Sequence, residues 1–477
     1  SLWNTVSFLS HFDGTNNGVN NVFDDGSASN HTITAVGNVT QGSFGPFARP
    51  DGEWSAALDG TGDYLSVADS ADFNFTSAYT VEGWINCTSP GFGYLLCQLQ
   101  DNDNSVSCIA LIIDSANLNI ILQQVVSGSF ESAAGGEGSS GFSLNTWHHI
   151  AGTWDGSNMR LFVDGVLKAT TATSNAPNNG SCPFTIGCRT ADGGSGGDNF
   201  ITGHISNARV VKNVAVYTSA FTPSTSPLTA ISGTVLLTAQ SNRFVDNSAS
   251  AHTITPVADA SVSAFGPFLT SEVYDPAVNG ASAYFDGNGD YLKNTNNNTD
   301  LQFGTGDLTV EFWLYLNQIG VVQYPFDTRQ APNGDGGGIQ VAILANNTMW
   351  VDMDGAGITL QTSLTLKANE WTHVALTRAS GTWRFFFNGV LNSGTASNSG
   401  NITGGYLSVG TSATRNTADT DDKIKGYMSD VRAVKGTAVY TSAFTPPTAP
   451  LTAITNTTLL LNMADGQAID SAAQNNL

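Results

Sequence analysis

Charged residues are scarce in this sequence of 477 residues: they make up 12 % of it, with only seven lysines and seven glutamates. Long helices draw heavily on Glu, Lys, Leu and Ala, so this shortage disfavours a helical protein. Gly, Ser, Thr and Asn are abundant instead, and aromatic residues reach 10 %. That balance is typical of short strands joined by polar turns. We therefore predict an all-β protein.

Positive charge is in shorter supply than negative charge. Seventeen Lys and Arg against 39 Asp and Glu give a formal net charge of −22, and no basic cluster offsets it. Nucleic acid and anionic bilayers would be repelled, and no stretch approaches the ~20 apolar residues of a membrane span. We expect no nucleic-acid partner and no membrane insertion, which leaves neutral glycans, cations and other protein surfaces.

Cysteines are few and confined to the first half of the chain, so disulfides do not define the fold. They are Cys87, Cys97, Cys108, Cys182 and Cys188. An odd number leaves at least one thiol free or intermolecular. Cys182 and Cys188 flank a short strand-like run and could bridge, whereas Cys-x-x-Cys and Cys/His zinc spacings are absent from the sequence.

The strongest positive signal is an internal duplication. The copies stand 221 to 229 residues apart, as expected when insertions sit in loops and strands stay fixed. The first three repeated motifs are FGPF at 44–47 and 265–268, LDGTGDYL at 58–65 with FDGNGDYL at 285–292, and TVEGW at 80–84 with TVEFW at 309–313. The later ones are WHHIA at 147–151 with WTHVA at 371–375, VDGVL at 163–167 with FNGVL at 387–391, and VYTSAFTP at 216–223 and 439–446.

A repeat of this length is one sandwich or barrel domain. We predict one domain over residues 1–228 and a second over 229–455, with a linker near residues 224–227. Residues 456–477 resemble the start of a third repeat, because TLLL at 458–461 matches VLL at 235–237. This tail is either part of a longer repeat array or a spare strand.

Each repeat contains a run of alternating apolar residues that leads into a tight turn. The turns are Asp164-Gly165 and Asn388-Gly389. Both residues of such a pair tolerate positive φ, so we predict type I′ β-hairpins here.

These motifs together resemble the laminin-G-like domains of the concanavalin A-like superfamily. The resemblance covers nearly all of both repeats and implies two tandem antiparallel β-sandwich (jelly-roll) domains. It leaves function open, because the superfamily includes lectins, glycosidases, adhesion modules and structural spacers. The VYTSAFTP segments and the tandem arrangement also resemble virion structural proteins of marine tailed phages.

Catalysis is disfavoured by the pattern of carboxylates. The laminarinase-type glycosidases of this superfamily carry Glu-x-Asp-x-x-Glu on one strand, and this spacing is missing here. Glu82 and Glu311 are single carboxylates beside a tryptophan, and His149 and His373 share one strand facing. We interpret these residues, and the neighbouring His148, as structural members of the sheets, and predict that the protein is not an enzyme.

Calcium is the cofactor that the resemblance implies, as a structural ion. Relatives hold it between an early Asp and a late Asp or Asn of the domain, which matches Asp25 with Asn207 and Asp246 with Asp430. Asn207 removes one charge from the first set. A separate rim candidate consists of Asp192 and Asp198 in one repeat and Asp419, Asp421 and Asp422 in the other. For each set, a solvated turn is an equally good interpretation.

Aromatic residues in non-repeated loops are the candidate ligand-binding residues, because sugar recognition uses exposed rings beside a few polar groups. They are Phe92, Tyr94, Tyr324 and Trp350. The repeated tyrosines and tryptophans are predicted to be core residues.

Two functions remain open for a protein outside the cell or on a virion surface. In the first, the domains are adhesive or glycan-binding modules. In the second, they are structural units that self-associate by stacking or by donating a strand such as 458–461, without a glycan ligand.

Overall fold

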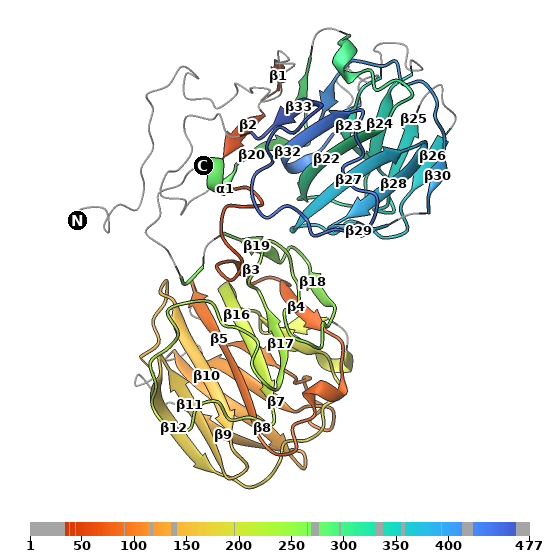
Figure 1. Cartoon of the computed structure of the whole chain (residues 1–477). Coiled ribbons are helices and arrows are strands. Elements are labelled where there is room, and N and C mark those ends of the chain that lie inside the picture. Colours follow the sequence, from red (N-terminus) through yellow and green to blue (C-terminus); the bar gives the residue numbers. More distant parts are fainter. Residues whose placement is uncertain are drawn as a thin grey trace, which may run out of the picture. The chain divides into compact units, whose positions relative to one another are not determined.

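The computed structural model describes residues 34–37, 39–42, 44–89, 91–114, 118–134, 141–194, 196–264, 266–268, 276–294, 297–329, 337–353, 358–392, 394–412 and 423–463. They form two compact β units (Figure 1). We call residues 50–268 the first domain, and residues 34–49 together with 276–463 the second domain. Each contains two large antiparallel sheets, as predicted. The helices in the described part of the chain are too short to cross a membrane.

The larger sheet of the first domain runs in the order β12-β11-β10-β5-β16-β3-β19, with β17 also beside β16. Its strands are β3 Ser55–Asp59, β5 Tyr79–Cys87, β10 His148–Trp154, β11 Asn158–Val163, β12 Val166–Ala172, β16 Thr202–Lys212, β17 Thr234–Thr238 and β19 Ser261–Ser263. The second sheet, in the order β18-β4-β13-β6-β7-β8-β9, comprises β4 Tyr64–Val67, β6 Gly93–Cys97, β7 Ile109–Asp114, β8 Asn119–Val126, β9 Ser129–Ala134, β13 Phe184–Ile186 and β18 Ile254–Val257. Short elements are β14 Arg189–Thr190, β15 Gly197–Asp198, η2 Ala71–Phe73 and η3 Asp192–Gly194.

The second domain repeats this plan. Its larger sheet, in the order β2-β20-β32-β22-β27-β28-β29 with β30 beside β28 and β33 beside β32, comprises β2 Thr40–Gly42, β20 Ser282–Asp286, β22 Leu308–Leu316, β27 Trp371–Ala379, β28 Thr382–Phe387, β29 Val390–Leu391, β30 Ala396–Ser397, β32 Lys425–Lys435 and β33 Thr457–Leu461. The other sheet, in the order β1-β21-β31-β23-β24-β25-β26, comprises β1 Thr34–Val36, β21 Tyr291–Lys293, β23 Gln323–Asp327, β24 Ile339–Ile343, β25 Met349–Met353, β26 Ile358–Gln361 and β31 Ser408–Val409. Short helical turns are α1 Pro276–Asn279 and η4 Thr299–Leu301.

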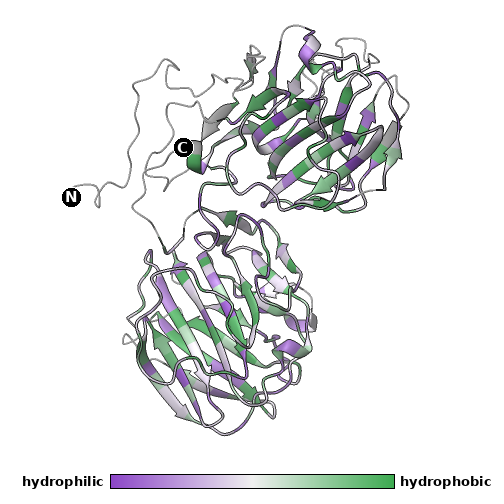
Figure 2. Ribbon diagram, in the orientation of Figure 1, coloured by the Kyte–Doolittle hydropathy of each residue, from purple (hydrophilic) through white to green (hydrophobic). Residues whose placement is uncertain are grey.

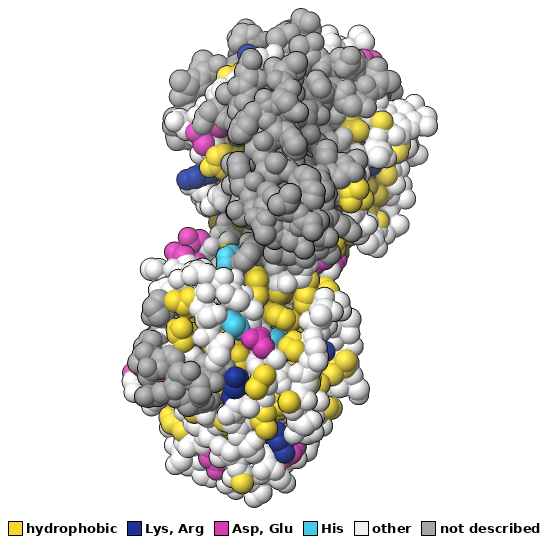
Figure 3. Space-filling model, turned by 90° about the vertical axis from the view of Figure 1, so that its left-hand side faces the viewer, with side chains coloured by type: hydrophobic (Ala, Val, Ile, Leu, Met, Phe, Trp, Pro, Cys, Tyr) yellow, Lys and Arg dark blue, Asp and Glu magenta, His cyan; other side chains and the backbone are white. Residues whose placement is uncertain are grey.

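Hydrophobic and hydrophilic residues alternate along many strands, as the period of two requires (Figure 2). On β25, for example, Met349, Val351 and Met353 are buried in the core while Trp350 and Asp352 are partly exposed. The predicted type I′ turns are confirmed: φ is 50° and 74° at Asp164 and Gly165, and 48° and 78° at Asn388 and Gly389. On the face of the first domain seen in Figure 3, charged side chains are few, in keeping with the low charged fraction.

All five cysteines are buried free thiols, so the suggested bridge between Cys182 and Cys188 is wrong. Strand β13 extends between these two residues and keeps them apart, whereas a disulfide needs Cα atoms within about 7 Å. Burial raises the pKa of Cys182 to about 12, which leaves the thiol protonated and unreactive.

The two domains do not coincide with the two sequence repeats, whose boundaries were predicted at 228/229 and 455/456. Strands β18 and β19 lie beyond residue 229, yet they pair with β4 and β3 of the first domain. Strands β1 and β2 precede the first domain in sequence, yet they pair with β21 and β20 of the second. β33, from the segment 456–477, lies beside β32 as β17 lies beside β16.

Candidate functional site

The repeated glutamate, histidine and arginine of the first domain meet on one face of its larger sheet. Glu82 of β5 receives two hydrogen bonds at Oε1 from Arg209 of β16, at 2.9 and 2.6 Å. Its Oε2 lies 3.1 Å from Nε2 of His149 on β10 and 2.8 Å from the hydroxyl of Tyr217. The second domain reproduces this cluster.

In the second domain, Glu311 accepts two hydrogen bonds from Arg432, at 2.9 and 2.6 Å. His373 lies 3.2 Å from its Oε2, and the hydroxyl of Tyr440 donates to the same oxygen at 2.9 Å. The prediction that Glu82, Glu311, His149 and His373 are structural sheet residues agrees with this repetition.

Each cluster is sealed beneath a segment that we call the strap: residues 213–231 in the first domain and 436–454 in the second. Tyr217 stacks on Phe221 with ring centroids 3.6 Å apart, and Tyr440 stacks on Phe444 at the same distance. The Phe221 N–H donates to the carbonyl of Gly165 at 2.9 Å. A Cβ at Gly165 would overlap the Phe221 carbonyl, so the Asp164-Gly165 turn needs glycine both for its positive φ and for this contact.

The electrostatics of the cluster favour a permanent ion pair over proton transfer. Burial raises the pKa of Glu82, but its hydrogen bonds to His149 and Arg209 and their charges outweigh burial, so the net pKa is lowered. Burial and the nearby Glu82 charge raise the pKa of Tyr217 well above its usual value. Glu82 and His149 are 0 % exposed, so no substrate reaches them.

Two of the predicted ligand-binding aromatics contact each other in the first domain, but only Phe92 is exposed. Tyr94 lies on β6 and is buried, so the prediction of an exposed loop residue is wrong for Tyr94. Phe92 and Tyr94 meet edge to face with ring centroids 5.6 Å apart, and 41 % of Phe92 is exposed. The guanidinium of Arg189 lies 5.2 Å from the centroid of the Tyr94 ring.

The same arginine also binds two aspartates. Arg189 donates to both carboxylate oxygens of Asp198, at 3.0 and 2.9 Å, and lies 2.8 Å from Asp101. Burial would lower the pKa of Arg189, but the hydrogen bonds to Asp198 outweigh it and raise the pKa. We call Phe92, Tyr94, Asp101, Arg189 and Asp198 the rim cluster. Sequence patterns could not find Arg189, because it has no counterpart in the other repeat.

The predicted rim aspartates are therefore only partly brought together. Asp198 is paired with Arg189, which occupies the position that a cation would need, and Asp192 is exposed in η3. Asp419, Asp421 and Asp422 lie outside the described residues.

The predicted calcium ligands Asp246 and Asn207 form hydrogen bonds with other groups of the protein. Asp246 accepts hydrogen bonds from the N–H groups of Leu237, Ser248 and His252, at 3.0, 2.9 and 2.8 Å. Asn207 accepts from the N–H of Leu228 at 2.8 Å and donates to the carbonyl of Gly52 at 2.8 Å. Both lie in the first domain, whereas the predicted partner of Asp246, Asp430, lies in the second. Asp25, the predicted partner of Asn207, lies outside the described residues.

Asp430 takes the place in the second domain that Asn207 takes in the first. Each is at the bulge of the longest strand, with φ of 51° and 52°, where Asn and Asp are tolerated. Asp430 accepts hydrogen bonds from the Leu451 N–H at 2.7 Å and the Asn462 amide at 2.6 Å. Complete burial raises its pKa to about 6.

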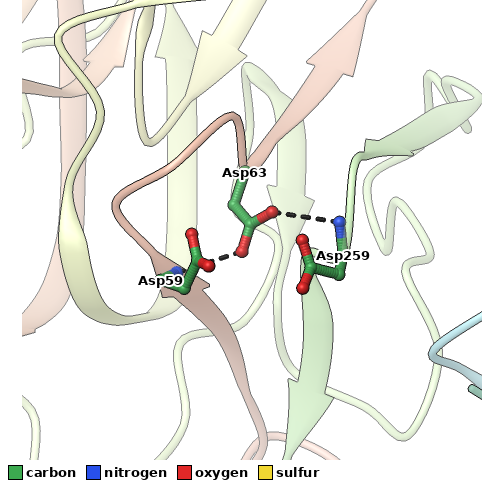
Figure 4. A group of neighbouring side chains, drawn as sticks. All are labelled: Asp59, Asp63 and Asp259. Atoms are coloured by element: carbon green, nitrogen blue, oxygen red, sulfur yellow. Dashed lines mark hydrogen bonds between the residues drawn. The ribbon is translucent and has the colours of Figure 1, made fainter.

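An acidic group that sequence analysis did not identify lies at the edge of the first domain (Figure 4). Asp59 and Asp63 belong to the repeated LDGTGDYL motif, and Asp259 comes from the turn between β18 and β19. Asp63 accepts hydrogen bonds from the N–H groups of Asp59 and Asp259, both at 3.0 Å. The three carboxylates approach within 4.8 Å of one another. Burial and the neighbouring Asp259 raise the pKa of Asp63 to about 6, although two backbone hydrogen bonds lower it.

The two predicted aromatics of the second domain are farther apart in the sheet. Tyr324 lies on β23 and Trp350 on β25, with β24 between these strands, and both are partly exposed. The aromatics therefore do not mark equivalent positions in the two domains.

A groove of about 630 Å³ lies beside the strap of the first domain. Its floor includes Trp84 and Phe268, whose rings meet edge to face at 5.4 Å. Glu53 and Asp164 supply carboxylates, and residues 222–227 form one wall. Its aromatic and acidic lining makes it a second place where a small polar ligand could fit.

Comparison with known proteins agrees with the architecture. The family described as the concanavalin A-like lectin/glucanases superfamily (Laminin G type) matches residues 59–224 and 286–443. No curated protein matches the chain.

Similar solved structures share low sequence identity with this chain. Domains LG4-5 of the mouse laminin alpha1 chain are 11 % identical, over 86 % of this chain and 94 % of that one, with a TM-score of 0.27. A SAP-like pentraxin from Limulus polyphemus is 15 % identical, over 43 % and 94 %, with a TM-score of 0.30. Domain 4 of an extracellular arabinanase from Geobacillus stearothermophilus, in complex with arabinotriose, is 15 % identical, over 33 % and 72 %, with a TM-score of 0.26.

Proposed function

Because this chain belongs to the concanavalin A-like lectin/glucanases superfamily, we propose that it is a non-catalytic carbohydrate-binding or adhesion protein of an extracellular or virion surface. The observation that carries the proposal is the rim cluster of the first domain. It combines a solvent-exposed ring with fixed hydrogen-bonding groups, the combination that sugar sites use.

The rim cluster has the chemistry of a neutral-sugar site. The exposed ring of Phe92 offers a flat face to the C–H groups of a pyranose. Asp101 and Asp198 accept hydrogen bonds from hydroxyl groups while Arg189 holds both carboxylates in position. The net charge of −22 disfavours a polyanionic glycan.

The repeated glutamates have no catalytic role in this proposal, because both lie in buried clusters. Glu82 and Glu311 lie on central strands of the larger sheets of the two domains. The carboxylate of each interacts with an arginine, a histidine and a tyrosine. Retaining or inverting glycosidases need two accessible carboxyl groups on either side of the scissile bond. These glutamates are single and enclosed.

The proposed location and cofactor rest on the sequence. The strap sequences resemble those of virion structural proteins, and the net charge of −22 suits an exterior protein. Structural calcium stays part of the proposal, with Asp59, Asp63 and Asp259 as the oxygen donors grouped in the described residues.

The test is a glycan array probed with the full chain, with calcium and again with a chelator. Binding to a defined neutral sugar that is lost in Phe92→Ala supports the rim cluster. Phe130→Ala is the matched control, because Phe130 is an exposed aromatic of β9 outside the cluster, and it should bind normally.

A further variant separates the rim cluster from the groove. Thr225→Trp fills the groove and should leave binding at the rim intact. Loss of binding in Thr225→Trp with normal binding in Phe92→Ala would move the site to the groove. A folded protein that binds no glycan in either condition would contradict the lectin function and favour a purely structural fibre or shell protein.

A further inference from the structure

Two hairpins with the same sequence pattern close the two domains. Hairpin A is residues 34–47, with β1 and β2, and hairpin B is residues 254–268, with β18 and β19. Thr34 pairs with Lys293 as Thr255 pairs with Ser66, and Val36 pairs with Tyr291 as Val257 pairs with Tyr64. The pairing of β2 with β20 likewise has the register of β19 with β3. Hairpin A thus fills in the second domain the place that hairpin B fills in the first.

Hairpin A is anchored by side chains as well as by strand pairing. Phe47 packs edge-on against Trp313, with ring centroids 5.5 Å apart. Phe44 lies 5.1 Å from both Tyr315 and Tyr427, and its carbonyl accepts a hydrogen bond from the Ser282 hydroxyl. Val39, Phe44 and Phe47 are all buried, so the second domain is complete only with this hairpin.

The connections of the two hairpins differ. Hairpin B follows β17, so the first domain is a continuous segment from residue 50 onward. Hairpin A precedes the whole first domain in the chain, and the chain passes from the second domain to the first between Arg49 and Pro50. The pairing surface that it fills, on β20 and β21, belongs to a segment that begins more than two hundred residues later.

Every contact of hairpin A described above is with the second domain. A second copy of the chain offers the same β20 and β21, in the same register and with the same aromatic residues, so the contacts are identical within and between molecules. Which arrangement prevails depends on the effective concentration of hairpin A near its own β20 and β21, against the concentration of the neighbouring copy. The connection between hairpin A and these strands runs through the whole first domain. Exchanging an element in this way costs no contact.

We propose that hairpin A is an intermolecular donor: residues 34–47 of one molecule complete the second domain of a second copy of this chain. Because donor and acceptor are different surfaces, the contact is head to tail and propagates into chains or closes into rings. The proposal is independent of glycan binding.

Variants that each carry one added cysteine provide the test, because the five native thiols are buried in the folded chain. Thr34→Cys places a thiol on β1 of one variant, and Lys293→Cys places a thiol on β21 of the other. The two thiols come within disulfide range only when β1 of one molecule pairs with β21 of the other. The two full-length variants are mixed, unfolded together, refolded at micromolar to about millimolar concentration, oxidised, and run on a non-reducing denaturing gel. A covalent dimer between the two variants, increasing with concentration, is expected.

Thr255→Cys mixed with Ser66→Cys is the matched control, because it probes the same register in the continuous first domain. This mixture, and each variant alone, should give covalent dimers at no more than one-tenth of the yield. Circular dichroism and a cooperative melt establish that all four variants are folded. If Thr34→Cys with Lys293→Cys yields no more dimer than the control at any concentration, the proposal is wrong.

Discussion

Phe47 packs edge-on against Trp313, although the two residues belong to different sequence repeats. Phe268 makes the same contact with Trp84 in the opposite direction, with centroids 5.4 Å apart. The FGPF motifs therefore recur because each closes the domain of the other repeat. Each domain depends for its stability on a residue that repeat boundaries would assign elsewhere.

Phe47→Ala should destabilise the second domain and leave the first unchanged. Removing a buried phenylalanine costs about 3–5 kcal/mol, and less where the site can collapse. Hydrogen exchange should show lost protection in β20 and β21. The reciprocal control Phe268→Ala should reduce protection in β3 and β4 instead. The reverse pattern for the two variants would contradict the assignment of each FGPF hairpin to the domain of the other repeat.

Asp430→Asn should stabilise the second domain at pH 7. At the equivalent site of the first domain, the Ser206 hydroxyl donates to the Trp54 carbonyl and accepts a hydrogen bond from the Asn207 amide. Each of these protons therefore has an acceptor of its own. At Asp430 the single Ser429 proton faces two acceptors, the Ala281 carbonyl and the carboxylate. Asparagine restores the arrangement of the first domain.

The gain depends on pH in a defined direction. The pKa of Asp430 rises from an ordinary 3.8 to about 6 in the folded state. Its contribution to stability is therefore complete below pH 4 and is lost as pH rises to about 6, by up to about 3 kcal/mol. Denaturant unfolding between pH 4 and 8 should show this decline in the wild type and not in Asp430→Asn. Asn207→Asp should introduce the same decline into the first domain, and flat profiles for both would refute the assignment.

Arg209→Leu should destabilise the first domain strongly, because it leaves the Glu82 carboxylate buried beside His149 without its cation. Breaking a buried pair by removing one partner costs about 3–5 kcal/mol. Arg160→Leu is the control: Arg160 and Asp155 form a partly exposed pair at 2.6 Å, worth less than about 1 kcal/mol. Equal effects in urea unfolding would show that the buried cluster contributes no more than a surface ion pair.

Asp259→Asn should stabilise the first domain modestly above pH 6 in the absence of divalent cations. Burial and the neighbouring Asp259 raise the pKa of Asp63 to about 6, so the Asp63 carboxylate is charged above that pH and the variant removes its unfavourable interaction with Asp259. Below pH 4, Asp63 is protonated in the folded and the unfolded state, and the gain should vanish. Calcium should raise the melting temperature of the wild type more than that of the variant. Equal calcium shifts in the two proteins would exclude Asp259 as a ligand.

Local pattern was enough to predict the strands and the type I′ turns at Asp164 and Asn388, because these depend on residues close in sequence. It also predicted the structural role of Glu82 and His149, because this depends on which face of the sheet their side chains occupy. It could not predict the hairpin exchange. Hairpins A and B share the FGPF motif and the same pairing register, so sequence pattern alone does not show which domain each hairpin joins. Arg189 was missed because it has no counterpart in the other repeat, and because its partner Asp101 is distant in sequence.

The position of hairpin A in the sequence also determines when it can pair during synthesis. Hairpin A leaves the ribosome before the first domain, yet its pairing strands β20 and β21 follow only after residue 280. At 5–20 residues per second, the nascent hairpin waits roughly 10–50 s with its strand edges unpaired while the first domain folds. During that interval the hairpin has no acceptor in its own chain, so an acceptor for it must come from a copy in which β20 and β21 are already made.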